Sequence, residues 1–326
     1  MINLLNLYNF LSGPATYSVS ASQFTGTAIP NSLHHIARDT DGQPVVLFRA
    51  RQSTVRPPSI LLRNVQIDHE LRCRVRRSDG TETVNTFSII RCLSRAEPLQ
   101  KTFFDLVSVL LLQLTNEPTS RELSEAFNRV SALFLALERP ASRSVQGLWG
   151  ELFLISRSKD ARLLVESWHI EAAERYDFAR EHHRLEVKTC GDRSRTHHFS
   201  YEQVYPPPGT TVVVASMFAE KTAAGASLGE LWDHVRSLVS NNFDLRLKID
   251  QVCIQSLGDS WEDARAVRFD SNLAAQSLAF YDIEDIPRIT FHLPVGISKV
   301  RFSSNLSLSK TLELNSAGPL VGSFTT

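Results

Sequence analysis

An acidic residue and a short charged motif near the middle of the chain could together hold a metal ion and act on a phosphate. Asp177 stands alone, and the sequence LEVKT, with Glu186 and Lys188 in it, follows downstream. Successive side chains of a strand point to opposite faces, so Glu186 and Lys188 should project together. Leu185 and Val187 should then face the core.

A polar turn at residues 181–184 allows the strands predicted over 173–180 and 184–189 to pair as a hairpin. That pairing would bring Asp177 beside Glu186. Two adjacent carboxylates repel each other unless a cation joins them, and Mg²⁺ prefers oxygen ligands while it keeps several waters. We therefore predict a Mg²⁺ site at Asp177 and Glu186, with the Val187 carbonyl as a further ligand. Lys188 would orient or activate a water and offset phosphate charge.

A helix predicted over residues 144–158 precedes these strands in the chain. It contains Gly147 and Gly150, and each internal glycine costs roughly 1 kcal/mol relative to alanine. Close approach of another backbone is the usual reason for such glycines. Glu151 is the only acid among the apolar neighbours that follow.

The predicted order is this helix, two strands, a short helix over 201–205 and a strand over 211–218, which indicates a mixed α/β unit. An acid on the helix, an acid on the first strand and Glu-x-Lys on the second resembles the PD-(D/E)XK nuclease superfamily. The matching residues, in order, are Glu151, Asp177, Glu186, Lys188 and Gln203. Tyr176 stands where the superfamily often has proline.

More narrowly, the sequence is similar to an uncharacterised bacterial family of PD-(D/E)XK motif proteins found in restriction-modification and defence gene clusters. The similarity lies in 147–153, Trp168, Asp177-Phe178, the Glu-Val-Lys core, 198–200, Gln203 and 294–306. It implies metal-dependent phosphodiester hydrolysis. Asp177 and Glu186 would bind Mg²⁺, with Mn²⁺ as an expected substitute. Lys188 would position the attacking hydroxide, Glu151 would reach the metal through water, and Gln203 would orient Lys188 or the phosphate.

Two features near the motif allow more than one interpretation. Gln203 closes a capping-box sequence that begins at Ser200, so it could be a helix cap instead of a catalytic residue. The histidines suggest zinc, but no cysteine joins them at ligand spacing, which favours a polar turn and a phosphate-contacting loop. The histidines concerned are His182, His183, His197 and His198.

A basic segment lies between residues 46 and 96, where ten arginines face four acids and give a net charge of +6 in a chain that is neutral overall. Arg72, Arg74 and Arg76 alternate there with apolar residues. A strand would place the three guanidiniums in a row that could follow a phosphate backbone, although a solvated strand face is an equal alternative. A second basic cluster includes Arg193 and Arg195, and with His198 these are further candidates for nucleic-acid contacts.

The whole chain, at 326 residues with 42% hydrophobic and 21% charged residues, suits a globular protein of more than one domain. We expect a β-rich accessory domain over 1–97, which could contact DNA, with a strand over 44–49 and a hairpin of strands over 71–76 and 83–91. A helical connector over 98–142 would contain helices over 99–114 and 121–139. The PD-(D/E)XK core would span 143–225, with an α/β region over 226–326 completing or flanking it. In that last region, strands are predicted over 251–256, 288–293 and 298–302. The predicted fold class is therefore α/β (α+β), with a mixed sheet flanked by helices and an N-terminal β-rich domain.

The sequence also indicates a cellular location and possible partners. It contains no apolar run long enough to span a bilayer and no clear signal peptide, so we expect a cytoplasmic protein with reduced cysteines and no membrane association. Our hypothesis is a metal-dependent DNA endonuclease of a bacterial defence system. A non-catalytic DNA-binding or scaffolding subunit is the alternative. No Walker-type phosphate loop is present, so an ATPase would be a partner subunit, and a homodimer is compatible with the sequence.

Overall fold

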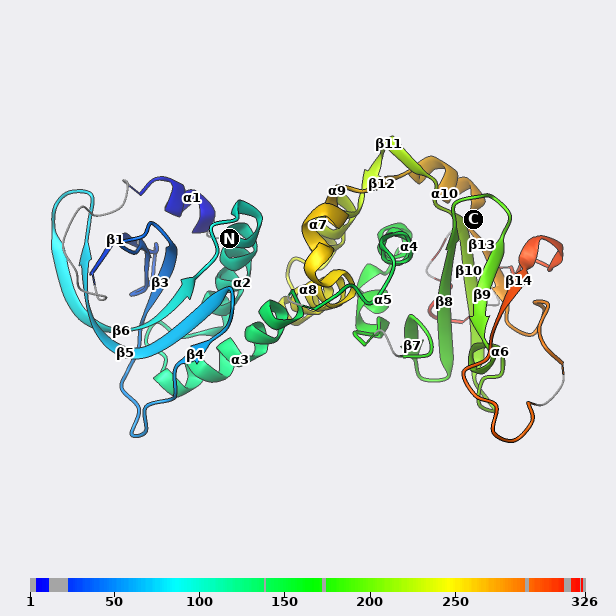
Figure 1. Ribbon diagram of the computed structural model, residues 1–326, viewed down its shortest axis with the longest axis horizontal. Coiled ribbons are helices and arrows are strands. Elements are labelled where there is room, and N and C mark those ends of the chain that lie inside the picture. Colours follow the sequence, from blue (N-terminus) through cyan, green and yellow to red (C-terminus); the bar gives the residue numbers. More distant parts are fainter. Residues whose placement is uncertain are drawn as a thin grey trace. The chain divides into compact units, whose positions relative to one another are not determined.

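The chain forms two compact units, Met1–Leu135 and Ala136–Thr326, in a computed structural model (Figure 1). The structure describes residues 4–11, 23–137, 139–171, 174–290, 293–313, 318–322 and 324.

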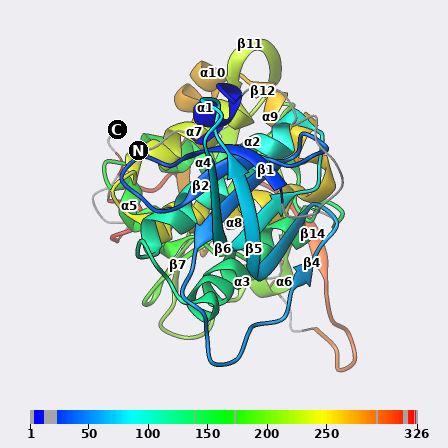
Figure 2. The same cartoon turned by 90° about the vertical axis from the view of Figure 1, so that its left-hand side faces the viewer.

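The first unit is built on a sheet that closes on itself. Its ring order is β1 (Gln23–Ala28), β2 (His35–Arg38), β3 (Pro44–Arg49), β6 (Glu82–Cys92) and β5 (Val65–Arg76). A parallel pairing of β1 with the end of β5 closes the ring, and β4 (Ile60–Leu61) pairs with the start of β5. Figure 2 looks onto strands β1, β5 and β6. The core of this barrel is apolar and comprises Phe24, Ala37, Val45, Leu47, Cys73, Val75, Phe87 and Ile89.

Local sequence signals account for several of these elements. The predicted hairpin is confirmed, because β5 and β6 pair in antiparallel fashion around a turn in which Gly80 has a φ of 83°. The strand predicted over 44–49 is β3. Helices α1 (Leu4–Asn9), α2 (Glu97–Gln113) and α3 (Ser120–Ala136) complete this part of the chain, and α2 and α3 match the helices predicted over 99–114 and 121–139 to within a few residues.

The second unit contains a mixed four-stranded sheet. Its order is β13 (Ala279–Asp282), β10 (Thr211–Phe218), β8 (His183–Cys190) and β7 (Phe178–Arg180). Strands β8 and β10 are parallel, and the other pairs are antiparallel. The mixed α/β fold class that the sequence predicts is confirmed.

The two faces of this sheet carry different elements (Figure 1). Helices α4 (Val145–Arg157) and α5 (Ala161–Ser167) lie against one face. Helices α7 (Leu228–Leu238), α8 (Phe243–Leu257) and α9 (Trp261–Ala266) form a further layer behind them. Strands β9 (Thr196–Ser200) and β14 (Arg301–Asn305) pair with each other on the opposite face, next to α6 (Tyr201–Val204). The remaining elements are β11 (Lys221–Ser227), β12 (Arg268–Phe269), α10 (Ser271–Ser277) and the short 3-10 turns Gly258–Ser260 and Leu306–Leu308.

Some predicted strands in this unit are wrong. Residues 251–256 lie inside helix α8, where Val252, Cys253 and Ile254 are all buried. A short apolar run that is buried on every side cannot be assigned to helix or strand by its periodicity. Residues 288–290 and 293 are not in a strand, and 291–292 lie outside the described residues. The strand predicted over 298–302 is β14, which begins at Arg301, after Lys299 with its φ of 57°.

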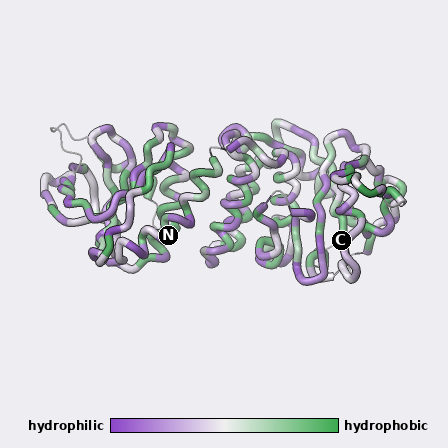
Figure 3. Tube along the Cα trace, turned by 60° about the horizontal axis from the view of Figure 1, so that its bottom comes forward, coloured by the Kyte–Doolittle hydropathy of each residue, from purple (hydrophilic) through white to green (hydrophobic). Residues whose placement is uncertain are grey.

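The first predicted strand of the motif is also shorter than expected. Strand β7 begins only at Phe178, and residues 174–177 form bends, while residue 173 lies outside the described part. Among the described residues, no helix is long and apolar enough to cross a membrane. Figure 3 shows hydrophobic and hydrophilic residues alternating along the helical segments.

Candidate active site

The β7–β8 hairpin places Asp177 at an open edge of β8. In its register Phe178 is opposite Leu185, so one further step brings Asp177 opposite Glu186. The Asp177 Oδ2 atom accepts a hydrogen bond of 2.8 Å from the backbone N–H of Val187, in place of a strand partner. Because the N–H and C=O of one strand residue point to the same side, the Val187 carbonyl faces the same edge.

Glu186 is almost fully buried, with 5% of its surface exposed. Its Oε1 atom accepts from Lys188 Nζ and from Gln203 Nε2, each at 2.7 Å. Its Oε2 atom is buried and has no hydrogen-bond partner in the described part of the chain. Burying a carboxylate oxygen without a partner is costly, so this atom is the feature of the site that most needs an explanation.

Gln203 holds Glu186 from the short helix α6. Its backbone and side chain form a capping box with Ser200, which confirms the helix-cap interpretation, while a catalytic role stays a prediction. The Gln203 Oε1 atom accepts from the Ser200 N–H at 3.0 Å, which fixes the amide. The amide nitrogen then donates to Glu186 and to the Arg175 carbonyl, the latter at 2.9 Å. The cap therefore fixes a donor that points at Glu186.

Glu151 approaches from helix α4, and a glycine permits that approach. A Cβ atom on Gly150 would lie 2.3 Å from Thr189 Cγ2 on β8, which confirms that a neighbour comes close, although it is a side chain and not backbone. Glu151 is 4% exposed. Its Oε2 atom accepts from Arg143 Nη1 and from Trp168 Nε1, each at 2.6 Å.

Arg143 is a residue of the site that the sequence analysis did not identify. Its Nη1 atom lies 3.9 Å from Asp177 Oδ1 as well as 2.6 Å from Glu151 Oε2. Its Nη2 atom also donates to the Glu171 carbonyl at 3.4 Å. It precedes helix α4 and belongs to no motif, so only the fold reveals its position between the two acids.

The acids raise one another's pKa values. Burial raises the pKa of Asp177 to about 7, and the charge of Glu151 adds to the effect. Burial also raises the pKa of Glu186 to about 7, with the charge of Asp177 as the second cause. Burial raises the pKa of Glu151, while Arg143 and Trp168 oppose that rise. A cation between Asp177 and Glu186 would relieve the repulsion that shifts both groups.

The residues present fit a magnesium ion. Asp177, the free Glu186 Oε2 atom and the Val187 carbonyl offer hard oxygen donors at one strand edge, and Mg²⁺ is typically held by one or two carboxylates with several waters. Within the described ranges, no group of three or more His, Cys, Asp or Glu side chains could hold a metal ion.

Three residues near the site that were predicted to contact nucleic acid differ in the contacts they make within the protein. His198 lines a pocket beside Lys188, and its Nδ1 atom lies 3.0 Å from Ser303 Oγ. Arg193 is exposed and ion-paired with Glu220. The Arg195 guanidinium donates to the Ser216 carbonyl and hydroxyl at 3.1 and 3.0 Å. Both arginines therefore use donors on the protein itself, and their contact with phosphate stays a prediction.

The arginine row lies on β5 of the first unit. Arg72 and Arg74 are exposed and Arg76 is half-buried, while Cys73 and Val75 point into the barrel core, as the alternation predicts. Arg74 lies 3.7 Å from Glu82. The geometry of the row is confirmed, and its role in binding phosphate stays a prediction.

One family of proteins matches the sequence. Its description is "Putative PD-(D/E)XK family member, (DUF4420)", and the match covers residues 6–307, which is most of the chain. No curated protein and no solved structure matches.

Proposed function

Because the chain belongs to this DUF4420 family of PD-(D/E)XK proteins and has a nuclease-like fold, we propose that it is a metal-dependent endonuclease. It would hydrolyse DNA phosphodiester bonds in a bacterial restriction or defence system. The observation that carries the proposal is the buried, unpartnered Glu186 Oε2 atom beside Asp177. If Glu186 served only the stability of the fold, a neutral residue in its place would be more stable, because it would bury no unpartnered carboxylate oxygen.

Mg²⁺, when bound at Asp177 and Glu186, would polarise the scissile phosphate and lower the pKa of a bound water. Lys188 would stabilise the charge that develops on the phosphate and orient the attacking water. Its Nζ atom lies 2.7 Å from Glu186 and 5.0 Å from the centre of the Phe199 ring, so the cation is held in one place.

The remaining residues of the site are positioning residues. Gln203 fixes the Glu186 carboxylate through Oε1, which leaves Oε2 directed elsewhere. Arg143 holds Glu151 and lies near Asp177, so it sets the local charge without touching Glu186. Such a shell of fixed donors is what keeps reacting groups in productive geometry.

The test compares wild type with Asp177→Ala on supercoiled plasmid, linear duplex and single-stranded RNA. Each substrate is incubated with Mg²⁺, Mn²⁺, Ca²⁺ or chelator. We expect DNA cleavage with Mg²⁺ or Mn²⁺, and by wild type alone. Ca²⁺ also binds oxygen ligands, and it serves here as the control for metal and DNA binding without cleavage. If both proteins bind DNA and neither cleaves under any condition, with or without candidate partner subunits, the non-catalytic DNA-binding role replaces the nuclease.

A further inference from the structure

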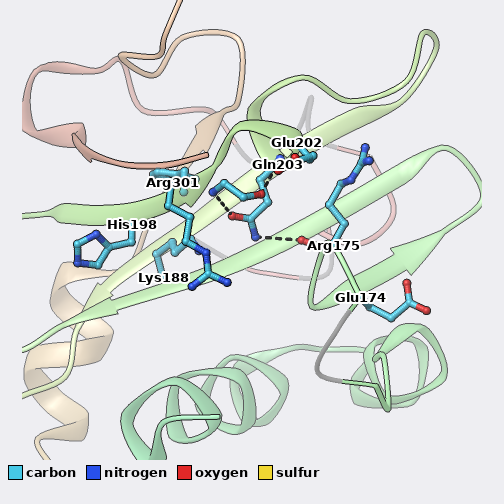
Figure 4. Close-up of a pocket in the computed structure, with 9 residues that line it drawn as sticks. Glu174, Arg175, Lys188, His198, Glu202, Gln203 and Arg301 are labelled. Atoms are coloured by element: carbon cyan, nitrogen blue, oxygen red, sulfur yellow. Dashed lines mark hydrogen bonds between the residues drawn. The ribbon is translucent and has the colours of Figure 1, made fainter. Parts of the chain in front are cut away.

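A pocket of about 550 Å³ opens beside Lys188, on the sheet face that carries β9 and β14. Its lining includes the cations Arg175, Lys188 and Arg301 together with His198, and the acids Glu174 and Glu202 (Figure 4). Its volume lies within the range of small-molecule sites. It is therefore large enough for one nucleotide unit.

Arg301 is the distinctive residue of this pocket. It stands on β14 opposite Ser200 of β9 and is exposed. Across the part of the chain that the structure describes, its guanidinium forms no ion pair or hydrogen bond, whereas Lys188 is paired with Glu186. Figure 4 shows the Arg301 side chain extending toward Lys188, between His198 and Arg175. Because no carboxylate of the described residues pairs with the Arg301 guanidinium, it is available to bind an anion that enters the pocket.

We propose that this pocket is a phosphate subsite, in which Arg301 binds the phosphodiester next to the one that is cleaved. The inference rests on the proposed function, because Lys188 borders both the pocket and the metal-binding edge. A guanidinium suits the role, since its planar fork can donate two parallel hydrogen bonds to one phosphate. His198, fixed beside Ser303, would be a second donor to the same strand.

The experiment measures binding of a labelled DNA duplex, and of the same single strand, by fluorescence anisotropy over a series of KCl concentrations with chelator present. It compares wild type with Arg301→Ala and Arg301→Lys. Arg157→Ala is the matched control, since Arg157 is an exposed arginine in the last turn of α4 and is not part of the pocket lining. Competition with a deoxynucleoside monophosphate and with inorganic phosphate distinguishes a strand from a free anion.

We expect Arg301→Ala to weaken binding and to reduce the slope of log affinity against log salt by about one. Arg301→Lys should keep most of the slope, Arg157→Ala should match wild type, and neither small competitor should displace DNA at concentrations well above those of the strand. The proposal is overturned if Arg301→Ala superimposes on wild type, if Arg157→Ala loses as much, or if wild type does not bind DNA. Displacement by inorganic phosphate alone would make the pocket a free-anion site and also overturn it.

Failure of this proposal can be told apart from failure of the nuclease assignment, because the binding assay contains no metal. If wild type cleaves DNA and Arg301→Ala keeps the full salt slope, only the subsite is rejected. If wild type never cleaves DNA while Arg301→Ala reduces the salt slope, the nuclease assignment is rejected. Arg301 is then still a phosphate contact, in a protein that binds DNA without cleaving it. Arg301 is exposed, so neither variant should change the unfolding midpoint, which a thermal melt verifies.

Discussion

The acid cluster has two ends, and they differ in what neutralises them. At one end Glu186 shares its Oε1 atom between Lys188 and Gln203 and keeps Oε2 buried and unpartnered. At the other end Glu151 is bound by Arg143 and Trp168. Glu186 therefore keeps one oxygen for an added cation beside Lys188, and we call this the open end. Both hydrogen bonds to Glu151 come from the protein, and we call that the closed end.

The two ends belong to the same site, yet of these two glutamates only Glu186 has a buried oxygen without a partner among the described residues. Both side chains are buried, so burial alone does not distinguish them. What distinguishes them is the satisfaction of their oxygens. Groups that remain unsatisfied at a stability cost are expected where function requires them.

The largest effect should come from the open end. Glu186→Gln keeps the shape of the side chain but removes its charge, so we expect Mg²⁺-dependent cleavage to fall by more than about 10³-fold, because both water activation and charge stabilisation depend on the ion. Ca²⁺ should also stop raising the thermal unfolding midpoint. Glu262→Gln makes the same chemical change at an exposed residue of α9 and should leave both properties intact. A Glu186→Gln protein that Ca²⁺ stabilises as well as wild type would show that the open end does not bind the ion.

The closed end should respond in stability. Arg143→Gln leaves Glu151 buried without its cation, and breaking a buried pair from one side costs about 3–5 kcal/mol. Urea unfolding measures this loss, which should become smaller as the pH falls, because burial raises the pKa of Glu151 and protonation removes its unpaired charge.

The double variant Arg143→Gln with Glu151→Gln is the control for the closed end. It should recover much of the lost stability, since a glutamine oxygen can still accept from Trp168. Calorimetry with Ca²⁺ then measures how many ions each protein binds. Wild type should bind one ion, and Arg143→Gln should gain a second, weaker site between Glu151 and Asp177. A wild type that binds two ions would contradict the idea that Arg143 closes this end.

Lys188→Ala tests the cation of the open end. It leaves both candidate ligands in place and removes the group that stabilises developing charge, so we expect the cleavage rate to fall about 10²–10³-fold. DNA binding should change little, because one phosphate contact is a small part of the electrostatic total. Lys159→Ala, an exposed lysine outside the site, is the matched control. Equal losses in rate and in binding would mean that Lys188 acts in binding only.

The sequence was sufficient to predict the open end and insufficient for the closed end. The period-two pattern around Glu186 and Lys188 and the polar turn before them predicted the hairpin that brings Asp177 to β8, and the structure forms it. These residues are close together in the chain, so strand geometry alone relates them. The Gly150 position likewise predicted a close neighbour.

Arg143 and Arg301 could not be found in this way, because their positions depend on tertiary packing. Arg143 meets Asp177 only after α4 packs on β8. Arg301 reaches the pocket only because β14 pairs with β9, from a segment far along the chain. The same limit explains the wrong strand at 251–256, where burial within the helical layer and not local pattern decides the conformation. The role of Glu151 through a metal-bound water stays a prediction.

The smallest effect should be a pH dependence of stability in the metal-free protein. The pKa of Asp177 and that of Glu186 are both raised to about 7, mainly by burial. A carboxyl whose pKa is raised on folding favours the folded state while it is protonated, and that contribution is lost as pH rises through the folded pKa. The free energy of unfolding should therefore fall between roughly pH 5 and pH 8.

Asp177→Asn is the variant that tests this cause. It should flatten the curve, since one titrating group is gone and Glu186 loses the neighbouring charge that raises its pKa, while an asparagine oxygen can still accept from the Val187 N–H. Asp285→Asn, at an exposed acid, should leave the wild-type slope unchanged. Urea unfolding at several pH values with chelator measures all three proteins. Adding Ca²⁺ should remove most of the fall in wild type alone, because the ion binds the deprotonated carboxylates. A metal-free wild type whose stability rises over this pH range would show that the open end is already neutralised within the protein, and the contrast between the two ends would disappear.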